Sequence, residues 1–279
     1  MKHLELYYSE IGNMGDLLNE ILFGELFGVR VQANHHRYRC NATGIGSYLS
    51  TFFPARSKAP RGVYAAGGRA LSMTIPLHIW STGFIRYPKE DEIALRSNMR
   101  IKCVRGELTR ERLSKILGRP LDIPTGDGGL LASELELGKI EKRYSLGVIP
   151  HFKERKEPAF AALAERYEHS VLIDLTEEPK AVLKKIAQCE TVLSSSLHGL
   201  IVADSFRVPN RRLVLTDALL GDGYKFDDYY SAYGIQDAPV INLLKDEPPS
   251  VNQIIDGYAI TDEAVKLKKK RLAESFLRG

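Results

Sequence analysis

The stretch Tyr-Ser-Leu-Gly-Val-Ile-Pro, residues 144–150, is a short and nearly continuous apolar run that ends at a proline, which is typical of a strand buried in a parallel sheet. Similar runs follow it at residues 170–174, 190–194 and 212–215. Segments with helical periodicity separate these runs, near residues 156–167, 179–188 and 197–206. Because strands that alternate with helices build parallel sheets, the C-terminal half predicts one doubly wound α/β domain.

The N-terminal half shows the same alternation. Residues 4–8 predict a strand, and after a turn of Gly and Asn residues Asp16 is expected to cap a helix that ends near Phe27. Later elements are a strand over 29–32, a strand over 99–104 and a helix over 109–117 that ends at Gly118. The sequence therefore predicts a further α/β domain in this half of the chain.

A polar stretch over residues 136–143 is typical of a domain linker. We therefore expect one domain over residues 1–138, a second over 139–260, and a terminal helix over 261–279. This last segment is basic between Ala264 and Gly279, with one acid, Glu274, against Lys266, Lys268, Lys269, Lys270, Arg271 and Arg278. Its periodicity predicts a helix that packs an apolar stripe back on the first domain, and its outward lysines would suit peripheral contact with an anionic membrane.

Composition excludes several classes of protein. Of the 279 residues, 44% are hydrophobic and 27% are charged, which argues against a disordered or fibrous chain. The longest uncharged stretch, residues 70–85, is shorter than a membrane span, and Glu5 interrupts the apolar run that a signal peptide would need. We therefore expect a cytoplasmic protein without a transmembrane helix. The net charge of +4 is too small for general nucleic-acid binding, so no nucleic-acid partner is expected.

The sequence also lacks the patterns of common cofactor sites. Cys40, Cys103 and Cys189 lie far apart, without the spacing of a disulfide framework or a thiolate zinc site. No close cluster of histidines and carboxylates predicts a catalytic metal, and neither the dinucleotide-binding nor the P-loop glycine motif occurs. We therefore expect neither a metal nor a bound cofactor.

The turns that follow the predicted strands carry the candidate site, because ligands of open α/β sheets bind beyond the carboxyl ends of the strands. Residues 194–199, Ser-Ser-Ser-Leu-His-Gly, bring three hydroxyls and an imidazole to the start of a helix, which suits a phosphate or a carboxylate. The structural alternative is that the serines cap the helix and His198 is a core histidine. Arg105 follows another predicted strand and could bind an oxyanion, or it could be a surface arginine beside Glu107 or Glu111.

Other turns on the same edge are polar. Asn13 and Asp16 follow the first strand, Asp127 lies in the glycine-rich turn 126–129, and His151 follows Pro150. Each of these residues could also serve only the conformation of its turn.

Seven short motifs occur in an order that resembles the polysaccharide pyruvyl transferase family. The motifs are Asn-Met-Gly-Asp (13–16), Gly-Ile-Gly-Ser (44–47), Val-Arg-Gly-Glu-Leu-Thr (104–109), Gly-Asp-Gly-Gly-Leu-Leu (126–131), Leu-Gly-Val-Ile-Pro-His (146–151), Ser-Ser-Leu-His-Gly-Leu-Ile-Val-Ala-Asp (195–204) and Lys-Phe-Asp-Asp-Tyr-Tyr (225–230). The match spans roughly residues 5–235, and its strength lies in order and spacing rather than in any single motif.

The resemblance implies a GT-B-like arrangement in which two Rossmann-like, doubly wound parallel-sheet domains face a cleft. It implies phosphoenolpyruvate as donor and a sugar of an exopolysaccharide or cell-surface glycan as acceptor, possible also in lipid-linked form. The product would be a pyruvate ketal that bridges two sugar hydroxyls, with release of phosphate.

The resemblance also assigns roles. The second domain would bind the donor together with Arg105, and the expected donor ligands are Arg105, Ser195, Ser196, Leu197, His198 and Lys225. The first domain would form the acceptor side, and the expected acceptor ligands are Asn13, Asp16 and Asp127 of that domain and His151 of the second. The family has an Arg-Leu-His turn where this chain has Ser196-Leu197-His198, so Lys225, Arg211 or Arg212 would have to supply the missing charge.

The chemistry of ketal formation agrees with these residues. Phosphoenolpyruvate carries a phosphate and a carboxylate, which need cations and oriented N–H groups. One acid/base group must act twice, and His198 is the candidate because its ordinary pKa is near 6.5. His198 and Arg105 are thus the expected catalytic residues, with His198 as a purely cationic donor to phosphate as the alternative. A glycosyltransferase that uses a nucleotide sugar, or a non-catalytic protein of glycan assembly, would be compatible with the same architecture.

Overall fold

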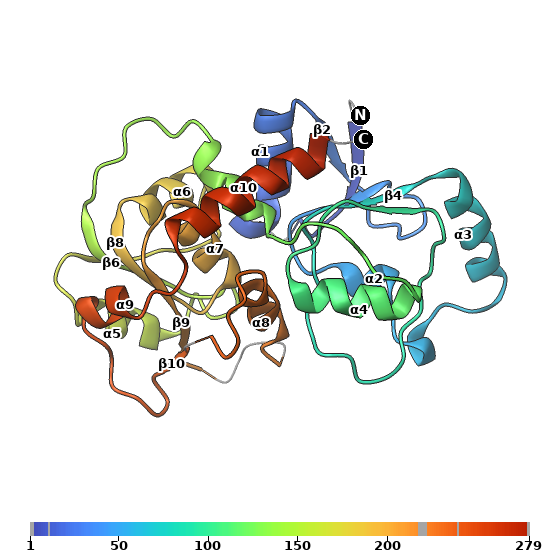
Figure 1. Cartoon of the computed structure of the whole chain (residues 1–279). Coiled ribbons are helices and arrows are strands. Elements are labelled where there is room, and N and C mark those ends of the chain that lie inside the picture. Colours follow the sequence, from blue (N-terminus) through green and yellow to red (C-terminus); the bar gives the residue numbers. More distant parts are fainter. Residues whose placement is uncertain (1–2, 11, 217–221, 239, 278–279) are drawn as a thin grey trace.

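Each half of the chain forms a five-stranded, wholly parallel sheet in the computed structural model, which describes residues 3–10, 12–216, 222–238 and 240–277 (Figure 1). The first sheet contains β1 (His3–Tyr7), β2 (Arg30–Ala33), β3 (Ala42–Thr43), β4 (Leu77–Ile79) and β5 (Met99–Ile101). The second contains β6 (Tyr144–Ile149), β7 (Ser170–Leu172), β8 (Cys189–Ser194), β9 (Asn210–Val214) and β10 (Val240–Asn242). Helices flank both sheets, which confirms the prediction of two Rossmann-like α/β domains.

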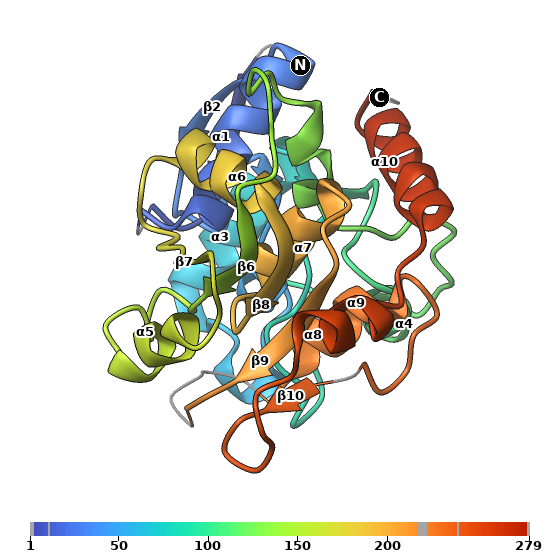
Figure 2. The same cartoon turned by 90° about the vertical axis from the view of Figure 1, so that its left-hand side faces the viewer.

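The two sheets have the same connectivity. Their strand orders are β2-β1-β3-β4-β5 and β7-β6-β8-β9-β10, and Figure 2 shows β6, β8 and β9 side by side. In each sheet the chain first adds a strand on one side of the starting strand and then crosses to the other side. The point where the direction changes lies between β1 and β3 in the first sheet and between β6 and β8 in the second, and this is where such sheets bind ligands.

The helices follow the strands in sequence. The first half contains α1 (Met14–Phe27), α2 (Leu49–Phe52), α3 (Gly62–Thr74), α4 (Glu107–Leu117) and the 3-10 helices η1 (Arg56–Lys58) and η2 (Gly128–Glu134). The second half contains α5 (Pro158–Glu165), α6 (Pro179–Ala187), α7 (Leu197–Ser205), α8 (Tyr224–Ser231), α9 (Val251–Asp256) and α10 (Asp262–Leu277). No helix in these described ranges is both long and apolar enough to cross a membrane.

The start of α1 differs from the prediction. Asn13 is the N-cap residue, with an extended backbone and a side-chain oxygen that accepts from the N–H of Gly15, so the prediction that Asp16 caps this helix was wrong. The reason is that the chain turns into the helix three residues earlier, which places Asp16 inside the first turn. The other end agrees with the usual chemistry, because Gly28 adopts the left-handed conformation at φ 62°.

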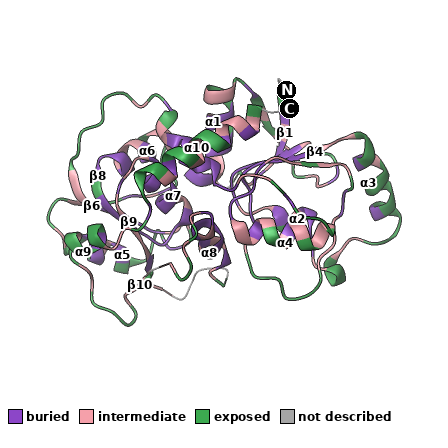
Figure 3. Ribbon diagram, in the orientation of Figure 1, coloured by how far each residue is buried: buried purple, intermediate pink, exposed green. Residues whose placement is uncertain are grey.

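The two domains share an apolar core. Leu18 and Leu22 of α1, Leu130 of η2, and Leu200 and Ile201 of α7 are fully buried members of one cluster. Figure 3 shows buried residues on α7 and the central strands, whereas α3 is largely exposed. The junction between the domains is therefore packed, and the turns at the carboxyl ends of both sheets lie against one another.

The terminal helix α10 packs against the first domain (Figure 1). The Phe276 ring stacks on Phe27 at 4.0 Å and on Phe23 at 5.2 Å between centroids. The indole N–H of Trp80 donates to the backbone oxygen of Leu272 and to Ser275 Oγ, at 3.3 and 3.0 Å. Arg278, the last residue of the basic segment, lies outside the described residues.

Candidate functional site

The points where strand order reverses in the two sheets meet at the domain junction. Gly15, in the first turn of α1, lies so close to His198, in the first turn of α7, that a Cβ atom at Gly15 would be 1.9 Å from His198 Nδ1. The backbone N–H of Met14 also donates to the Leu175 oxygen at 2.8 Å. Only glycine at position 15 lets the N-terminal ends of the two helices approach this closely.

The serine turn after β8 is held mainly by its own hydroxyls. Ser194 Oγ accepts from the N–H of Ser196 at 3.0 Å. Ser195 Oγ accepts from the N–H of His151 at 2.8 Å and donates to Glu154 Oε2 at 2.6 Å, so it joins the turns after β8 and β6. Ser196 is the N-cap residue of α7, and its hydroxyl makes no hydrogen bond within the described part of the chain. Of the three serines, Ser196 is thus the one whose hydroxyl is available to a ligand.

The imidazole of His198 lies at the centre of this junction. Its Nε2 atom is shielded from solvent and has no hydrogen-bond partner among the described residues. Burial lowers its pKa to about 3, and the positive charges of Lys225 and Arg105 lower it further in the same direction. His198 is therefore neutral at pH 7, with one unsatisfied ring nitrogen. The side chain of Leu197, by contrast, belongs to the core, so this residue can offer only its backbone.

Lys225, at the start of α8, is the central cation of the junction. Its ammonium group forms no ion pair and no hydrogen bond with any described residue, and it lies 5.1 Å from the centroid of the Phe226 ring. Burial lowers its pKa to about 8, as do the charges of Arg105 and Arg212, whereas Glu154 opposes the shift. Its charge also lowers the pKa values of Asp16, His151 and His198, so it acts electrostatically on all three side chains.

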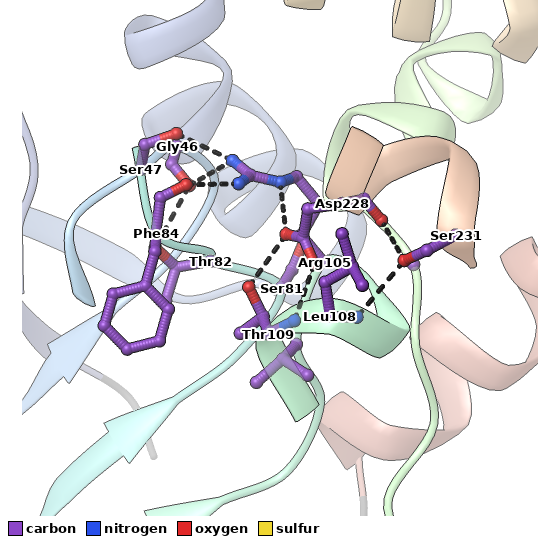
Figure 4. A network of polar contacts seen from close by, with 12 residues as sticks. Gly46, Ser47, Ser81, Thr82, Phe84, Arg105, Leu108, Thr109, Asp228 and Ser231 are labelled. Carbon is purple, nitrogen blue, oxygen red and sulfur yellow. Dashed lines mark hydrogen bonds and ion pairs between the residues drawn. The ribbon is translucent and has the colours of Figure 1, made fainter. Parts of the chain in front are cut away.

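Arg105 is completely buried and takes part in a network of polar contacts (Figure 4). Its Nε donates to Asp228 Oδ2 at 2.9 Å, and its Nη1 donates to Ser47 Oγ at 2.7 Å. The second terminal nitrogen, Nη2, donates to the backbone oxygen of Phe84. Asp228 also accepts from the backbone N–H and the hydroxyl of Thr109, at 2.7 and 2.8 Å. Direct contact between Arg105 and a ligand would therefore require this ion pair to open.

Asp16 supplies a carboxyl group with an unusual proton affinity. It is half-buried in the first turn of α1, and the hydroxyl of Tyr48 donates to its Oδ1 atom. Burial raises the pKa of Asp16 to about 6, although the bond from Tyr48 and the charge of Lys225 both act to lower it. The Tyr48 hydroxyl in turn accepts from the N–H of Ser9 at 3.1 Å, which fixes its orientation.

The remaining predicted acceptor residues occupy different settings. Asn13 uses its side chain to cap α1. Asp127 is fully buried and caps η2 by accepting from the N–H of Gly129 at 2.9 Å, and burial raises its pKa to about 6. His151 is half-buried, and burial and the charge of Lys225 lower its pKa to about 3. The structure thus brings Asp16, His151, His198 and Lys225 together.

Several residues of the junction were missed by sequence reasoning. Glu154 is buried and accepts from both Ser195 and the hydroxyl of Thr216. Asp228 was quoted within a motif but given no role, and Tyr48 directly follows the Gly-Ile-Gly-Ser motif. No local pattern in the sequence singles out Glu154.

The arrangement suits a small, doubly charged organic anion. An ammonium, an imidazole nitrogen and a hydroxyl that have no partner among the described residues lie together at the N-terminus of the nine-residue helix α7. A carboxyl group that titrates near pH 6 lies beside them. In the part of the chain that the structure describes, no three His, Cys, Asp or Glu residues are grouped so that they could hold a metal ion.

Comparison with known proteins gives the following similarities. The chain is 30% identical over 137 residues to the uncharacterized protein L143 of Acanthamoeba polyphaga mimivirus, an alignment that covers 48% of each chain. It is 27% identical over 140 residues to the succinoglycan biosynthesis protein ExoV of Rhizobium meliloti (strain 1021), which covers 50% of this chain and 42% of ExoV. The chain thus spans about half the length of the curated relatives that it matches. No solved structure gives a significant match.

The family model described as polysaccharide pyruvyl transferase matches residues 13–214, which is well over half of the chain. This range begins at the N-cap of α1 and ends with β9, so it contains the first turns of α1 and α7, which meet at the domain junction, and His198. The chain belongs to the polysaccharide pyruvyl transferase family.

Proposed function

We propose that the protein transfers the enolpyruvyl group of phosphoenolpyruvate to two hydroxyls of one sugar in an exopolysaccharide or cell-surface glycan, which forms a pyruvate ketal and releases phosphate. Family membership supports pyruvyl transfer, and ExoV, named as a succinoglycan biosynthesis protein, supports an exopolysaccharide acceptor. The observation that carries the proposal is that the Lys225 ammonium and the nearby His198 Nε2 both lack a partner among the described residues.

The donor would bind at the N-terminus of α7. Its phosphate or carboxylate would accept from the backbone N–H groups of the first turn, from the Ser196 hydroxyl and from His198 Nε2. Lys225 would neutralise the second anionic group. Because Lys225 already acts electrostatically on His198, it lies close enough to supply the charge that the family arginine at position 196 would bring.

Arg105 would act on the donor mainly through its charge and its position. Its ion pair with Asp228 joins the turn after β5 to α8, the helix that carries Lys225. Arg105 also lowers the pKa values of His198 and Lys225, so its field reaches the donor position. We assign Arg105 to the donor site in this sense.

The reaction needs two additions at the same carbon. A proton is added to the methylene carbon of phosphoenolpyruvate, and the first sugar hydroxyl attacks the neighbouring carbon. The proton of this hydroxyl passes to a base. The bond from this carbon to the phosphate oxygen then breaks. The second hydroxyl attacks the same carbon, and its proton leaves with phosphate. Each turnover thus consumes one donor and two hydroxyls of the acceptor and leaves no net proton on the protein.

His198 and Asp16 divide the proton transfers in this proposal. A bound dianion stabilises the protonated imidazole and so raises the low pKa of His198, which allows it to act as the acid toward the methylene carbon. Asp16, on the acceptor side, takes the proton of the first hydroxyl when it is ionised. Asn13, His151 and Asp127 remain proposed acceptor-side residues.

We further propose a cytoplasmic enzyme that meets a lipid-linked acceptor at the inner face of the cytoplasmic membrane. Two lysines of α10 are occupied within the protein, since Lys268 Nζ donates to Thr125 Oγ1 at 3.0 Å and Lys269 Nζ pairs with Glu134 at 3.1 Å. The contribution of α10 to membrane contact would therefore rest on the exposed Lys266, Lys270 and Arg271.

The test is release of inorganic phosphate from phosphoenolpyruvate in the presence of a panel of oligosaccharide acceptors, with detection of the ketal by mass spectrometry. Lys225→Met is expected to abolish most activity, and Lys266→Met, at an exposed site on α10, is the matched control. Release of a nucleoside diphosphate from a nucleotide sugar would instead identify a glycosyltransferase. A folded protein that binds no phosphoenolpyruvate would indicate a non-catalytic role.

A further inference from the structure

Residues 26–89 contain no Asp or Glu, although the whole chain has 35 acidic residues. The segment carries nine basic side chains, which are Arg30, Arg37, Arg39, Arg56, Lys58, Arg61, Arg69, Arg86 and Lys89. All except Arg37 are exposed, and none of the nine side chains forms an ion pair or a hydrogen bond with a described residue. This segment of the first domain therefore contributes nine positive charges and no negative charge of its own.

The helix α3 lies within this segment. Its larger apolar side chains are on the solvent side rather than on the buried side. Its inward side consists of the small residues Ala65, Gly68 and Ser72, and Gly68 sits so close to the Tyr38 ring that a Cβ atom would be 2.4 Å from it. Its outward side, at helical spacing, is apolar. We call this side the α3 face, and it consists of Val63, Ala66, Ala70 and Met73.

The α3 face is open to solvent. Val63 is 90% exposed and Met73 is 67% exposed, and the neighbouring Tyr64 is 60% exposed. Large apolar side chains that are exposed together on one helix mark an interaction surface more often than isolated ones do. Figure 1 shows α3 at the end of the first domain that points away from the second, so an occupant of this surface leaves the domain junction free.

Basic side chains border the α3 face. Arg61 immediately precedes the helix, and Arg69 lies within it. The Tyr64 ring contacts those of His36 and Tyr38, with centroids 6.2 and 6.0 Å apart, which places the loop carrying Arg37 and Arg39 beside α3. Acidic groups approach the segment at η1, where Ser57 donates to Glu90.

We propose that the α3 face and its bordering arginines dock the protein on an anionic lipid bilayer. A helix with exposed apolar side chains and basic neighbours lies in the plane of a membrane interface, with the apolar groups among the acyl chains and the cations at the headgroups. A polyanion such as a nucleic acid would match the charge but would leave Val63 and Met73 without a function. Charge complementarity and apolar exposure together thus favour the lipid surface, independently of the chemistry at the domain junction.

The test is sedimentation of the full chain with vesicles of phosphatidylcholine alone or mixed with phosphatidylglycerol. We expect binding to the mixed vesicles only. Arg61→Gln/Arg69→Gln is expected to lower the partition coefficient about 30-fold at low salt, because each basic residue near an anionic surface contributes ~1 kcal/mol. Val63→Ser/Met73→Ser is expected to lower it about tenfold or more at both low and high salt, since apolar insertion is not screened.

Lys156→Gln/Lys245→Gln, in the second domain, removes the same number of exposed charges elsewhere and is the matched control. Equal losses for the α3-segment and the second-domain charge variants would reduce the effect to net charge and overturn the proposal. So would the absence of wild-type binding. If the wild type sediments as a dimer in analytical ultracentrifugation and Val63→Ser/Met73→Ser makes it monomeric without changing vesicle binding, the α3 face is a self-association surface instead. All four α3-segment substitutions are at exposed positions, so folding should be unaffected.

Discussion

Replacing Asp228 with asparagine is expected to destabilise the protein strongly, because this side chain compensates a buried charge across the domain junction. Asp228 and Arg105 are both fully buried, and their side chains are 2.9 Å apart at Oδ2 and Nε. Oδ2 also accepts from the Thr109 hydroxyl, and Oδ1 accepts from the Thr109 backbone N–H. The partners of the Asp228 carboxylate in these three bonds are therefore all hydrogen-bond donors.

An asparagine cannot satisfy this arrangement in either orientation of its amide. One orientation turns the NH₂ group toward Arg105 and the Thr109 hydroxyl, and the other turns it toward the Thr109 backbone N–H. The arginine charge would in addition remain buried without a counter-ion. Removing one partner of a buried pair costs about 3 to 5 kcal/mol. At about 2 to 4 °C per kcal/mol for a protein of this size, the melting temperature should fall by roughly 6 to 20 °C.

Thermal unfolding followed by circular dichroism measures this effect. Asp227→Asn is the control, because Asp227 is the next residue of α8, is half-buried, and accepts from the exposed Tyr87 hydroxyl at 3.0 Å. It should cost less than about 1 kcal/mol. The reasoning is refuted if both variants melt within about 2 °C of each other. The double variant Arg105→Met/Asp228→Leu removes both charges and should be more stable than Asp228→Asn.

Other predictions concern the domain junction. Tyr48→Phe removes a donor that lowers the pKa of Asp16, so the acid limb of kcat/KM, expected near pH 6, should move to higher pH; an unmoved limb would show that Asp16 is not the titrating base. His198→Gln should keep the dissociation constant for phosphoenolpyruvate within a few-fold while kcat falls by about 10²-fold or more, whereas equal losses would make His198 a donor ligand. Lys225→Met should weaken phosphoenolpyruvate binding in titration calorimetry by roughly 10- to 100-fold, and unchanged affinity would place the donor elsewhere. Folded His198 resists protonation down to about pH 3, so acid favours the unfolded chain, in which this histidine can be protonated. The free energy of unfolding of the wild type relative to His198→Gln should therefore fall as the pH drops from about 6.5. Parallel curves of unfolding free energy against pH for the two proteins would contradict this.

Sequence patterns predicted the central strands of the second domain well because β6 and β8 have runs of consecutive buried residues, which marks strands covered on both faces. The predicted strand over residues 144–149 has the bounds of β6, and the helices α6 and α7 end within one residue of their predicted ends. The sequence predicts no helix or strand between β2 and β5. The strands there are too short to show periodicity, because β3 has two residues and β4 has three. The helix α3 was missed for another reason. Its outward residues are as apolar as its inward ones, so no amphipathic pattern marks it.

The candidate site was predictable where it depends on topology alone. Parallel strands bring the turns at their carboxyl ends together, which is why Asp16, His151 and His198 were found. Their partners were not found, because pairing depends on how the domains pack. Arg105 and Asp228 are 123 residues apart in sequence, and Ser195 and Glu154 are 41 apart. The sequence alone did not distinguish a ligand-binding role of Ser195 from a structural one. In the structure its hydroxyl is bonded within the protein, to His151 and Glu154.

The packing of α10 on the first domain also sets the order in which that domain can mature during synthesis. The rings of Phe23, Phe27 and Trp80 are made early, whereas Leu272 and Phe276, which pack on them, are synthesised only after the whole of the second sheet. Until then the nascent first domain exposes an aromatic surface to the cell and to chaperones. Because synthesis runs from the N-terminus, the first domain can complete its packing only after the second domain has been synthesised.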